Sequence, residues 1–225
     1  MTTFRVSFVL AVLCSLLAGA PDSVVGWLAY DRQAILAGQA WRAWTGHLVH
    51  FGWQHAVADV AVLLAATAIL ERFKGWRAAA WLFLAGAPLI SLALLLGVPD
   101  LQVYEGASGI ATMFGVASGC CLWRAEPGLR GALVLLAMGA LLKLMVDAGG
   151  VVVPGITTLP AGIQVAWQAH VVGAILGGIP VLASGGRGGR QGRVLQSSPG
   201  SAMRVPRTKG GRVSTNSSAT SLYNL

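Results

Sequence analysis

The chain has 225 residues, of which 55% are hydrophobic and only 11% are charged, and its mean hydropathy is +0.68. A soluble domain of this length cannot bury so large an apolar fraction, which excludes an ordinary soluble enzyme. The formal net charge of +8 comes from basic residues that flank apolar segments or lie near the C-terminus, which argues against a nucleic-acid-binding protein.

Six apolar segments are predicted to span a bilayer, which requires roughly 20 mostly apolar residues each. In chain order they cover about 5–21, 51–70, 77–97, 107–123, 131–147 and 165–183. An open sheet is excluded, because backbone polar groups in lipid must be satisfied within the structure. The connections are short, so we predict an all-α membrane protein whose residues 1–184 form one bundle of six transmembrane helices. Residues 185–225 are rich in Gly, Ser, Arg and Thr and are predicted to be a disordered, basic cytoplasmic tail.

The first segment has two interpretations. Arg5, the apolar run and Ala18-Gly19-Ala20 resemble a cleavable signal peptide. Pro21 directly follows the would-be cleavage site and argues against cleavage, so we interpret the segment as a retained helix.

The distribution of basic residues predicts the orientation. With the N-terminus inside, 13 of the 16 Lys and Arg residues lie on the cytoplasmic side, and only Arg32 and Arg42 lie outside. This pattern follows the positive-inside rule and places both termini in the cytoplasm.

Several polar residues are predicted to meet near the outer face of the bundle. Ser108 opens the fourth segment at a depth of ~5 Å, and His170 lies ~7 Å deep in the sixth, by the rise of ~1.5 Å per helical residue. Polar groups within membrane helices usually mark a pathway or a functional site. The others at this level are His47, His50, His55 and Asp59 at the start of the second segment.

Small residues at i+4 spacing predict that the fourth and sixth helices approach closely. Such ridges let helix backbones pack tightly in lipid. They consist of Ala111, Gly115 and Gly119 in the fourth segment and of Ala169, Gly173 and Gly177 in the sixth.

Ser108 and His170 together indicate a nucleophile and its base. A serine hydroxyl is a poor nucleophile until its proton is accepted, and the protonated His170 then has a proton for the leaving amine. The N–H groups of Ser108 and Gly109, free at the start of a helix, are expected to stabilise the oxyanion, and Gly106 leaves room for a substrate backbone. No third acid is evident, so the predicted site is a Ser-His dyad.

The motifs that carry these residues resemble those of the rhomboid family. Gly106-Ala107-Ser108-Gly109 is similar to the rhomboid GxSG motif, and Ala169-His170-x-x-Gly173-x-x-x-Gly177 to AHxxGxxxG. Further matches in the family's order are Trp41-Arg42-x-x-Thr45 in the first loop, His50-Phe51-x-x-x-His55 at the entry to the second helix, and Glu71-Arg72 at its exit.

This resemblance implies a six-helix fold and a serine endopeptidase that cleaves transmembrane protein substrates in the lipid bilayer without a metal or cofactor. The compact build is similar to the rhombosortase branch, which implies action on C-terminal Gly-rich anchors of secreted proteins. It also implies a multi-pass protein of the bacterial inner membrane, with the active site toward the periplasm.

Asp59 departs from the family pattern. Rhomboids usually have an asparagine four residues after the second-helix histidine, where its amide supports the oxyanion. An ionised carboxylate only accepts hydrogen bonds and would repel the oxyanion. The residue therefore either stays protonated and donates, leaves the task to His55 and the backbone, or orients His55.

Two features of the fifth segment and the stretch after it allow further expectations. Lys143 and Asp147 are one turn apart and are expected to form an intramembrane ion pair, with a role in substrate gating as the alternative. The uncharged stretch 148–164 contains two prolines and is expected to form a lid-like cap on the outer face.

Three other functions remain open. A metal or haem site at the four histidines is one, although it leaves Gly106–Gly109 unexplained. An inactive rhomboid relative that binds membrane clients is the second, and Asp59 favours it. A transporter is the third, although no internal repeat supports it.

Overall fold

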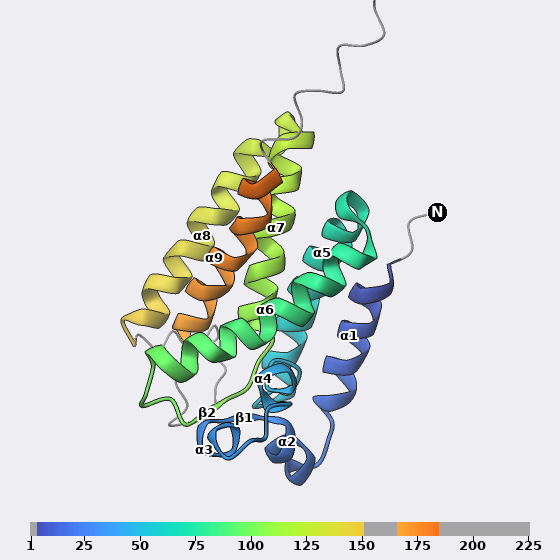
Figure 1. Cartoon of the computed structure of the whole chain (residues 1–225). Helices are drawn as coiled ribbons and strands as arrows, with labels where there is room; N and C mark the ends of the chain where they lie inside the picture. The colour runs from blue at the N-terminus through green and yellow to red at the C-terminus, as the bar shows by residue number, and fades with distance from the viewer. Residues whose placement is uncertain (1–3, 151–165, 185–225) are drawn as a thin grey trace, which may run out of the picture. The chain divides into compact units, whose positions relative to one another are not determined.

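The computed structural model describes residues 4–150 and 166–184, with side chains up to residue 179, and these residues are mostly helical (Figure 1). A helix occupies each of the six ranges predicted from the sequence. These long helices are α1 (Arg5–Leu17), α5 (Trp53–Lys74), α6 (Trp76–Gly97), α7 (Ser108–Ala125), α8 (Arg130–Ala148) and α9 (Trp167–Ser184). The predicted tail over 185–225 and the predicted cap beyond residue 150 lie outside the described residues.

Short elements that the sequence analysis did not predict connect the long helices. Those before α5 form a compact segment outside the bundle, and α1 ends before it because Gly19 and Pro21 do not continue a helix. The short elements are α2 (Asp22–Leu28), β1 (Tyr30–Asp31), α3 (Arg32–Leu36), α4 (Arg42–Thr45), β2 (Val103–Tyr104) and the 3-10 turn η1 (Pro127–Leu129).

Two helical stretches, Trp76–Gly97 and Pro127–Ala148, are long and apolar enough by themselves to cross a membrane, while α1 and Trp167–Ile179 are shorter apolar helices. α5 is as long as α6 but is not one of these two stretches, and it contains charged residues such as the buried Asp59 and Glu71. The predicted mostly helical fold is therefore confirmed, apart from the short pairing of β1 with β2, whereas six membrane crossings stay a prediction.

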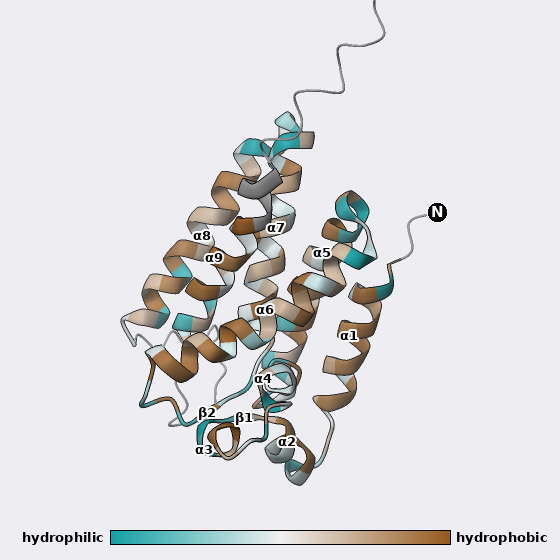
Figure 2. Ribbon diagram, in the orientation of Figure 1, coloured by the Kyte–Doolittle hydropathy of each residue, from teal (hydrophilic) through white to brown (hydrophobic). Residues whose placement is uncertain are grey.

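α7 is the helix around which the bundle packs. It contacts α5, α6 and α9, and its inner face buries Ile110, Met113 and Phe114 completely. α8, by contrast, has no buried residue and packs only lightly against α7, α9 and η1 within the described residues. Figure 2 shows hydrophobic residues along the lengths of the helices and hydrophilic ones gathered at their ends. This distribution suits a bundle that is surrounded by lipid.

The closest helix contact joins α7 to α9 at the small residues of α9. A Cβ on Gly173 would overlap the carbonyl oxygen of Gly109, and a Cβ on Gly177 would overlap that of Met113. The glycines of α9 therefore form the predicted ridge. Two residues of the ridge predicted on α7, Gly115 and Gly119, do not take part in this contact, because a Cβ on either would have no neighbour within 4 Å among the described residues.

The carboxylate of Glu71, at the end of α5, caps the first turn of α1. It accepts hydrogen bonds from the backbone N–H groups of Arg5 (3.0 Å), Val6 (2.9 Å) and Ser7 (3.1 Å), and from the Ser7 hydroxyl (2.6 Å). These N–H groups have no acceptor within their own helix. Glu71 therefore fixes α1 against α5 at the end of the bundle far from Ser108.

The segment between α1 and α5 is held by a buried arginine. One Arg42 nitrogen, Nη1, donates to the carbonyl oxygens of Gly26 and Ala29, both at 2.8 Å. β1 then pairs with β2 in antiparallel register, Tyr30 opposite Tyr104. Through β2 the segment holds the loop that leads directly into α7.

Candidate active site

The turn before α7 places Ser108 at the first residue of the helix. Gly106 has a φ of 134°, which residues with a side chain rarely adopt. A Cβ on Gly106 would also lie 3.1 Å from Cε1 of His55 and 3.4 Å from Oδ2 of Asp59. Glycine is thus required here both by the backbone conformation and by the close approach of α5.

The first turn of α7 offers backbone donors beside Ser108. The first helical hydrogen bond runs from Ala111 N to Ala107 O at 2.7 Å, so the N–H groups before Ala111 have no acceptor within the helix. The positive end of the helix dipole lies at the same place. Of the two predicted donors, the Gly109 N–H interacts with the hydroxyl of Tyr104. The Ser108 N–H is the one left for a substrate.

His170 lies in the first turn of α9, directly after the fully buried Ala169. The Cβ and the carbonyl oxygen of Ala169 lie 3.2 and 3.3 Å from the position of a Cβ on Gly109. The first turns of α7 and α9 therefore pack against each other, and Ser108 and His170 belong to these two turns. Within the described residues the two side chains share no hydrogen bond. Catalytic hydrogen bonds are often long in substrate-free enzymes and tighten in the complex.

Two histidines and one carboxylate form a cluster beside the Ser108 turn. Oδ2 of Asp59 lies 3.3 Å from Nε2 of His50 and 3.5 Å from Nε2 of His55. Nε2 of His50 also accepts a hydrogen bond from the backbone N–H of Ala107 at 3.3 Å. The side chain of His50 is fully buried, and those of Asp59 and His55 are 10% and 23% exposed. The cluster therefore contacts the residue directly before Ser108.

The hydrogen bond from Ala107 identifies Nε2 of His50 as an acceptor, so in the neutral ring the proton is assigned to Nδ1. Oδ2 of Asp59 lies within reach of the Nε2 atoms of both His50 and His55. This position allows Asp59 to interact with either ring, and its role in orienting His55 stays a prediction.

His47 lies apart from this cluster, although the sequence places it at the same level. Its Nε2 is 3.0 Å from both the Ala87 carbonyl oxygen and the Ser91 hydroxyl of α6. Burial lowers the pKa of the His47 ring to about 4, so the ring is neutral at pH 7. The described residues include no group of three His, Cys, Asp or Glu side chains that could hold a metal ion. The four-histidine metal site is thus wrong in its ligand set, because His47 bonds to α6 instead.

The expected ion pair of α8 is confirmed. Nζ of Lys143 lies 2.6 Å from Oδ2 of Asp147, with the lysine side chain 55% exposed and the aspartate 6% exposed. His170 interacts electrostatically with both groups, as it does with Asp59 and His55. The pair therefore lies on the side of α8 that faces the candidate site, while its role in gating stays a prediction.

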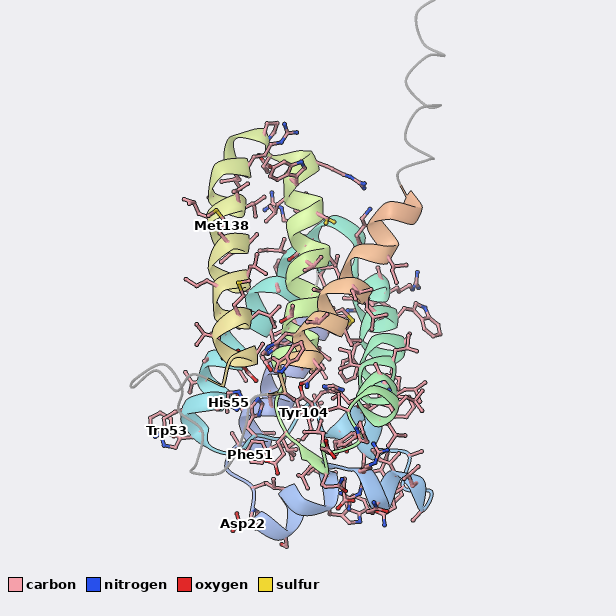
Figure 3. The ribbon with its side chains drawn as sticks, turned by 90° about the vertical axis from the view of Figure 1, so that its left-hand side faces the viewer. Asp22, Phe51, Trp53, His55, Tyr104 and Met138 are labelled. Carbon is pink, nitrogen blue, oxygen red and sulfur yellow. The ribbon has the colours of Figure 1, made fainter. Side chains whose placement is uncertain are left out.

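The sequence analysis gave three residues near Ser108 no catalytic or supporting role. His50 carried a signal, its position in the HFxxxH motif. Thr112 donates from Oγ1 to the Ser108 carbonyl oxygen at 2.8 Å, and Tyr104 donates from its hydroxyl to the Gly106 carbonyl oxygen at 2.7 Å. Figure 3 shows Tyr104 and His55 at the same end of the bundle, far from Met138. Neither Thr112 nor Tyr104 belongs to a motif that the sequence analysis could use.

Comparison with known proteins places the whole site within one domain family. A family model described as a Rhomboid domain matches residues 37–183, which include every residue of the cluster, the Ser108 turn and His170. No curated protein matches the chain.

Proposed function

The chain belongs to the rhomboid family of intramembrane serine proteases, which are integral membrane proteins, and we propose that it is an active endopeptidase whose dyad is Ser108 and His170. The observation that carries the proposal is the packing of Gly109 against Ala169. It brings the first turns of α7 and α9 together, and each turn carries one member of the dyad.

In the proposed reaction His170 accepts the proton of the Ser108 hydroxyl as Ser108 attacks a substrate carbonyl carbon. The tetrahedral intermediate then expels the amine, which takes the proton from His170. Water, activated in turn by His170, hydrolyses the acyl-enzyme and restores Ser108. The dyad thus needs no metal or cofactor.

The oxyanion of the intermediate is stabilised, in this proposal, by the Ser108 N–H at the start of α7 and by His55. Backbone donors at a helix N-terminus combine a fixed direction with the positive end of the helix dipole. His55 contributes the N–H of Nδ1, which has no hydrogen-bond partner within the described residues, while its Nε2 faces Asp59. This assignment makes the carboxylate a support for His55 rather than a direct oxyanion partner.

We further propose a rhombosortase-type role, in which the substrates are secreted proteins held by C-terminal Gly-rich membrane anchors. The proposal places the enzyme in the bacterial inner membrane with its active site toward the periplasm. Basic residues at the helix ends away from Ser108, such as Arg72 and Lys74 of α5 and Arg124 of α7, support this orientation. A reporter with a Gly-rich anchor is expected to be cleaved, and one whose anchor glycines are replaced by leucine is not.

The direct test is reconstitution in lipid vesicles with a transmembrane substrate, comparing the wild type with Ser108→Ala and His170→Ala. Ser118→Ala is a matched control, because Ser118 is a buried serine of α7 whose hydroxyl donates to the Gly115 carbonyl oxygen of its own helix. Loss of cleavage in both dyad variants, with the control unchanged, supports the proposal. Cleavage that survives either dyad substitution contradicts it.

The second candidate function is client binding without cleavage. It is favoured by Asp59 in place of the usual asparagine and by the lack, within the described residues, of a hydrogen bond between the Ser108 and His170 side chains. In that case the wild type and Ser108→Ala would retain the same clients on purification, and neither would yield cleaved products.

A further inference from the structure

Tyr104 packs against the turn that carries Ser108. Its side chain is buried, with 4% of the residue exposed, and its hydroxyl donates to the carbonyl oxygen of Gly106 at 2.7 Å. The same hydroxyl is 3.3 Å from the position of a Cβ on Gly109. It also interacts with the Gly109 N–H and with the side chain of Ser108. One hydroxyl thus contacts the residues on both sides of Ser108.

The ring that carries this hydroxyl is fixed by residues distant in the sequence. Tyr104 pairs with Tyr30 across β1 and β2, and the two rings meet edge to face with centroids 6.4 Å apart. The ring of His47 packs against Tyr104 in a similar way, with centroids 5.3 Å apart. A tyrosine has only two side-chain torsions, so these contacts leave the hydroxyl little freedom.

The turn needs such a partner because its own residues provide none. Ala107, the N-cap of α7, has no side chain that can bond the first turn, and Gly106 has no side chain at all. Without Tyr104 the buried carbonyl oxygen of Gly106 would lose the hydroxyl that donates to it. An unpaired buried polar group costs about 1–3 kcal/mol. Burial raises the pKa of the Tyr104 hydroxyl, so it remains a neutral donor throughout the physiological range.

We propose that Tyr104 is a positioning residue for the nucleophile, whose hydroxyl bridges Gly106 and Gly109 and so holds Ser108 at the start of α7. This inference rests on the proposed protease function. It assigns the residue no contact with substrate. The pairing between β1 and β2 then has a role beside the active site, because it fixes the position of Tyr104, whose hydroxyl bonds to the turn before α7.

The test replaces the hydroxyl alone, in Tyr104→Phe, and uses Tyr30→Phe as a matched control. Tyr30 is a fully buried tyrosine of the same ring pair, and within the described residues its hydroxyl makes no hydrogen bond to the Ser108 turn. We expect Tyr104→Phe to lower kcat by roughly ten-fold or more while KM stays unchanged, because a small displacement of a reacting group can cost up to about a hundred-fold in rate. The rate at which a fluorophosphonate labels Ser108 should fall in parallel, and Tyr30→Phe should match the wild type in both.

Melting temperatures of all three proteins separate positioning from folding, and each assay is run well below the lowest of them. A Tyr104→Phe protein that labels and cleaves at the wild-type rate contradicts the inference, whatever its melting temperature. If Tyr104→Phe does not fold, 3,5-difluorotyrosine at position 104 keeps the ring and a more acidic hydroxyl. In that protein kcat should fall at a lower pH than in the wild type, and an unchanged pH profile contradicts the inference.

Ser108→Ala distinguishes this inference from the proposed function. If Ser108→Ala cleaves like the wild type, the protease assignment itself fails. If Ser108→Ala is inactive and Tyr104→Phe is fully active, only the role of Tyr104 fails.

Discussion

Gly173 of α9 lies so close to Gly109 of α7 that a side chain on Gly173 would overlap the Gly109 carbonyl oxygen. Gly109 directly follows the candidate nucleophile, and Gly173 lies three residues after the candidate base. The helix contact and the proposed catalytic geometry therefore depend on the same few atoms.

Replacing Gly173 with alanine is expected to push α9 away from α7. Overpacking of this kind destabilises a protein by about 1–3 kcal/mol. Cleavage should fall more than stability does, because His170 lies one turn before the substituted residue. Gly178→Ala on the same helix is the control, since the position of its Cβ has no neighbour within 4 Å among the described residues. Equal melting temperatures and equal cleavage rates for the two variants would contradict the proposed packing.

The substitution Asp59→Asn is expected to retain or increase cleavage. An asparagine amide can donate to Nε2 of His50 or His55, which an ionised carboxylate cannot do, and it keeps the size of the side chain. The measurement is kcat/KM on a transmembrane substrate in vesicles, with Asp59→Leu as the variant that removes both polar atoms and should be impaired. A complete loss of cleavage in Asp59→Asn would show that the carboxylate itself is needed to orient His55.

Glu71→Gln is expected to loosen α1 without changing the chemistry. The carboxylate accepts four hydrogen bonds at the start of α1, whereas the amide turns a donor toward some of the same N–H groups. Hydrogen bonds to charged groups contribute about 1.5–3 kcal/mol each, so a clear drop in melting temperature is expected. Glu126→Gln, at an exposed residue after α7, is the control. If both variants melt like the wild type, the cap does not stabilise the fold.

Acidification is expected to destabilise the protein through His47. The folded-state pKa of His47 is lowered to about 4 by burial, from an unfolded value near 6.5. Between these two pH values the unfolded chain binds a proton that the folded chain does not, so stability falls as the pH drops from about 6.5 to 4. At 1.36 kcal/mol per pKa unit the effect is on the order of 3 kcal/mol.

Melting temperatures measured at pH 7 and pH 4.5 test this prediction. In a His47→Gln variant that still folds, the difference between the two melting temperatures should be smaller than in the wild type. An equal difference would assign the acid sensitivity to other groups.

The long helices could be predicted from the sequence, and the residues of the proposed dyad could be selected from it, because both depend on local patterns. Apolar runs of about 20 residues determine α6 and α8, and Ser108 and His170 stand in short motifs. The partners of those residues depend on contacts between distant segments. Tyr104 reaches the Ser108 turn only because β2 pairs with β1, and two-residue strands leave no periodic pattern.

The small-residue ridges show the same limit within the helices. Spacing alone identified Gly173 and Gly177 as well as Gly115 and Gly119, yet only the first pair faces the neighbouring helix. Which face of α7 packs against α9 is determined by the rest of the bundle. Likewise, His47 and His50 stand three residues apart at the same level, but one ring bonds to α6 and the other to the turn before Ser108.

The most direct measurement of the central claim is labelling of the detergent-solubilised protein by a fluorophosphonate or isocoumarin probe, followed by mass spectrometry of the modified peptide. The proposed dyad predicts one adduct on Ser108, present in the wild type and in Ser118→Ala and lost in His170→Ala. An unmodified Ser108 in protein that cleaves its substrate, or full labelling of Ser108 without His170, would contradict the dyad.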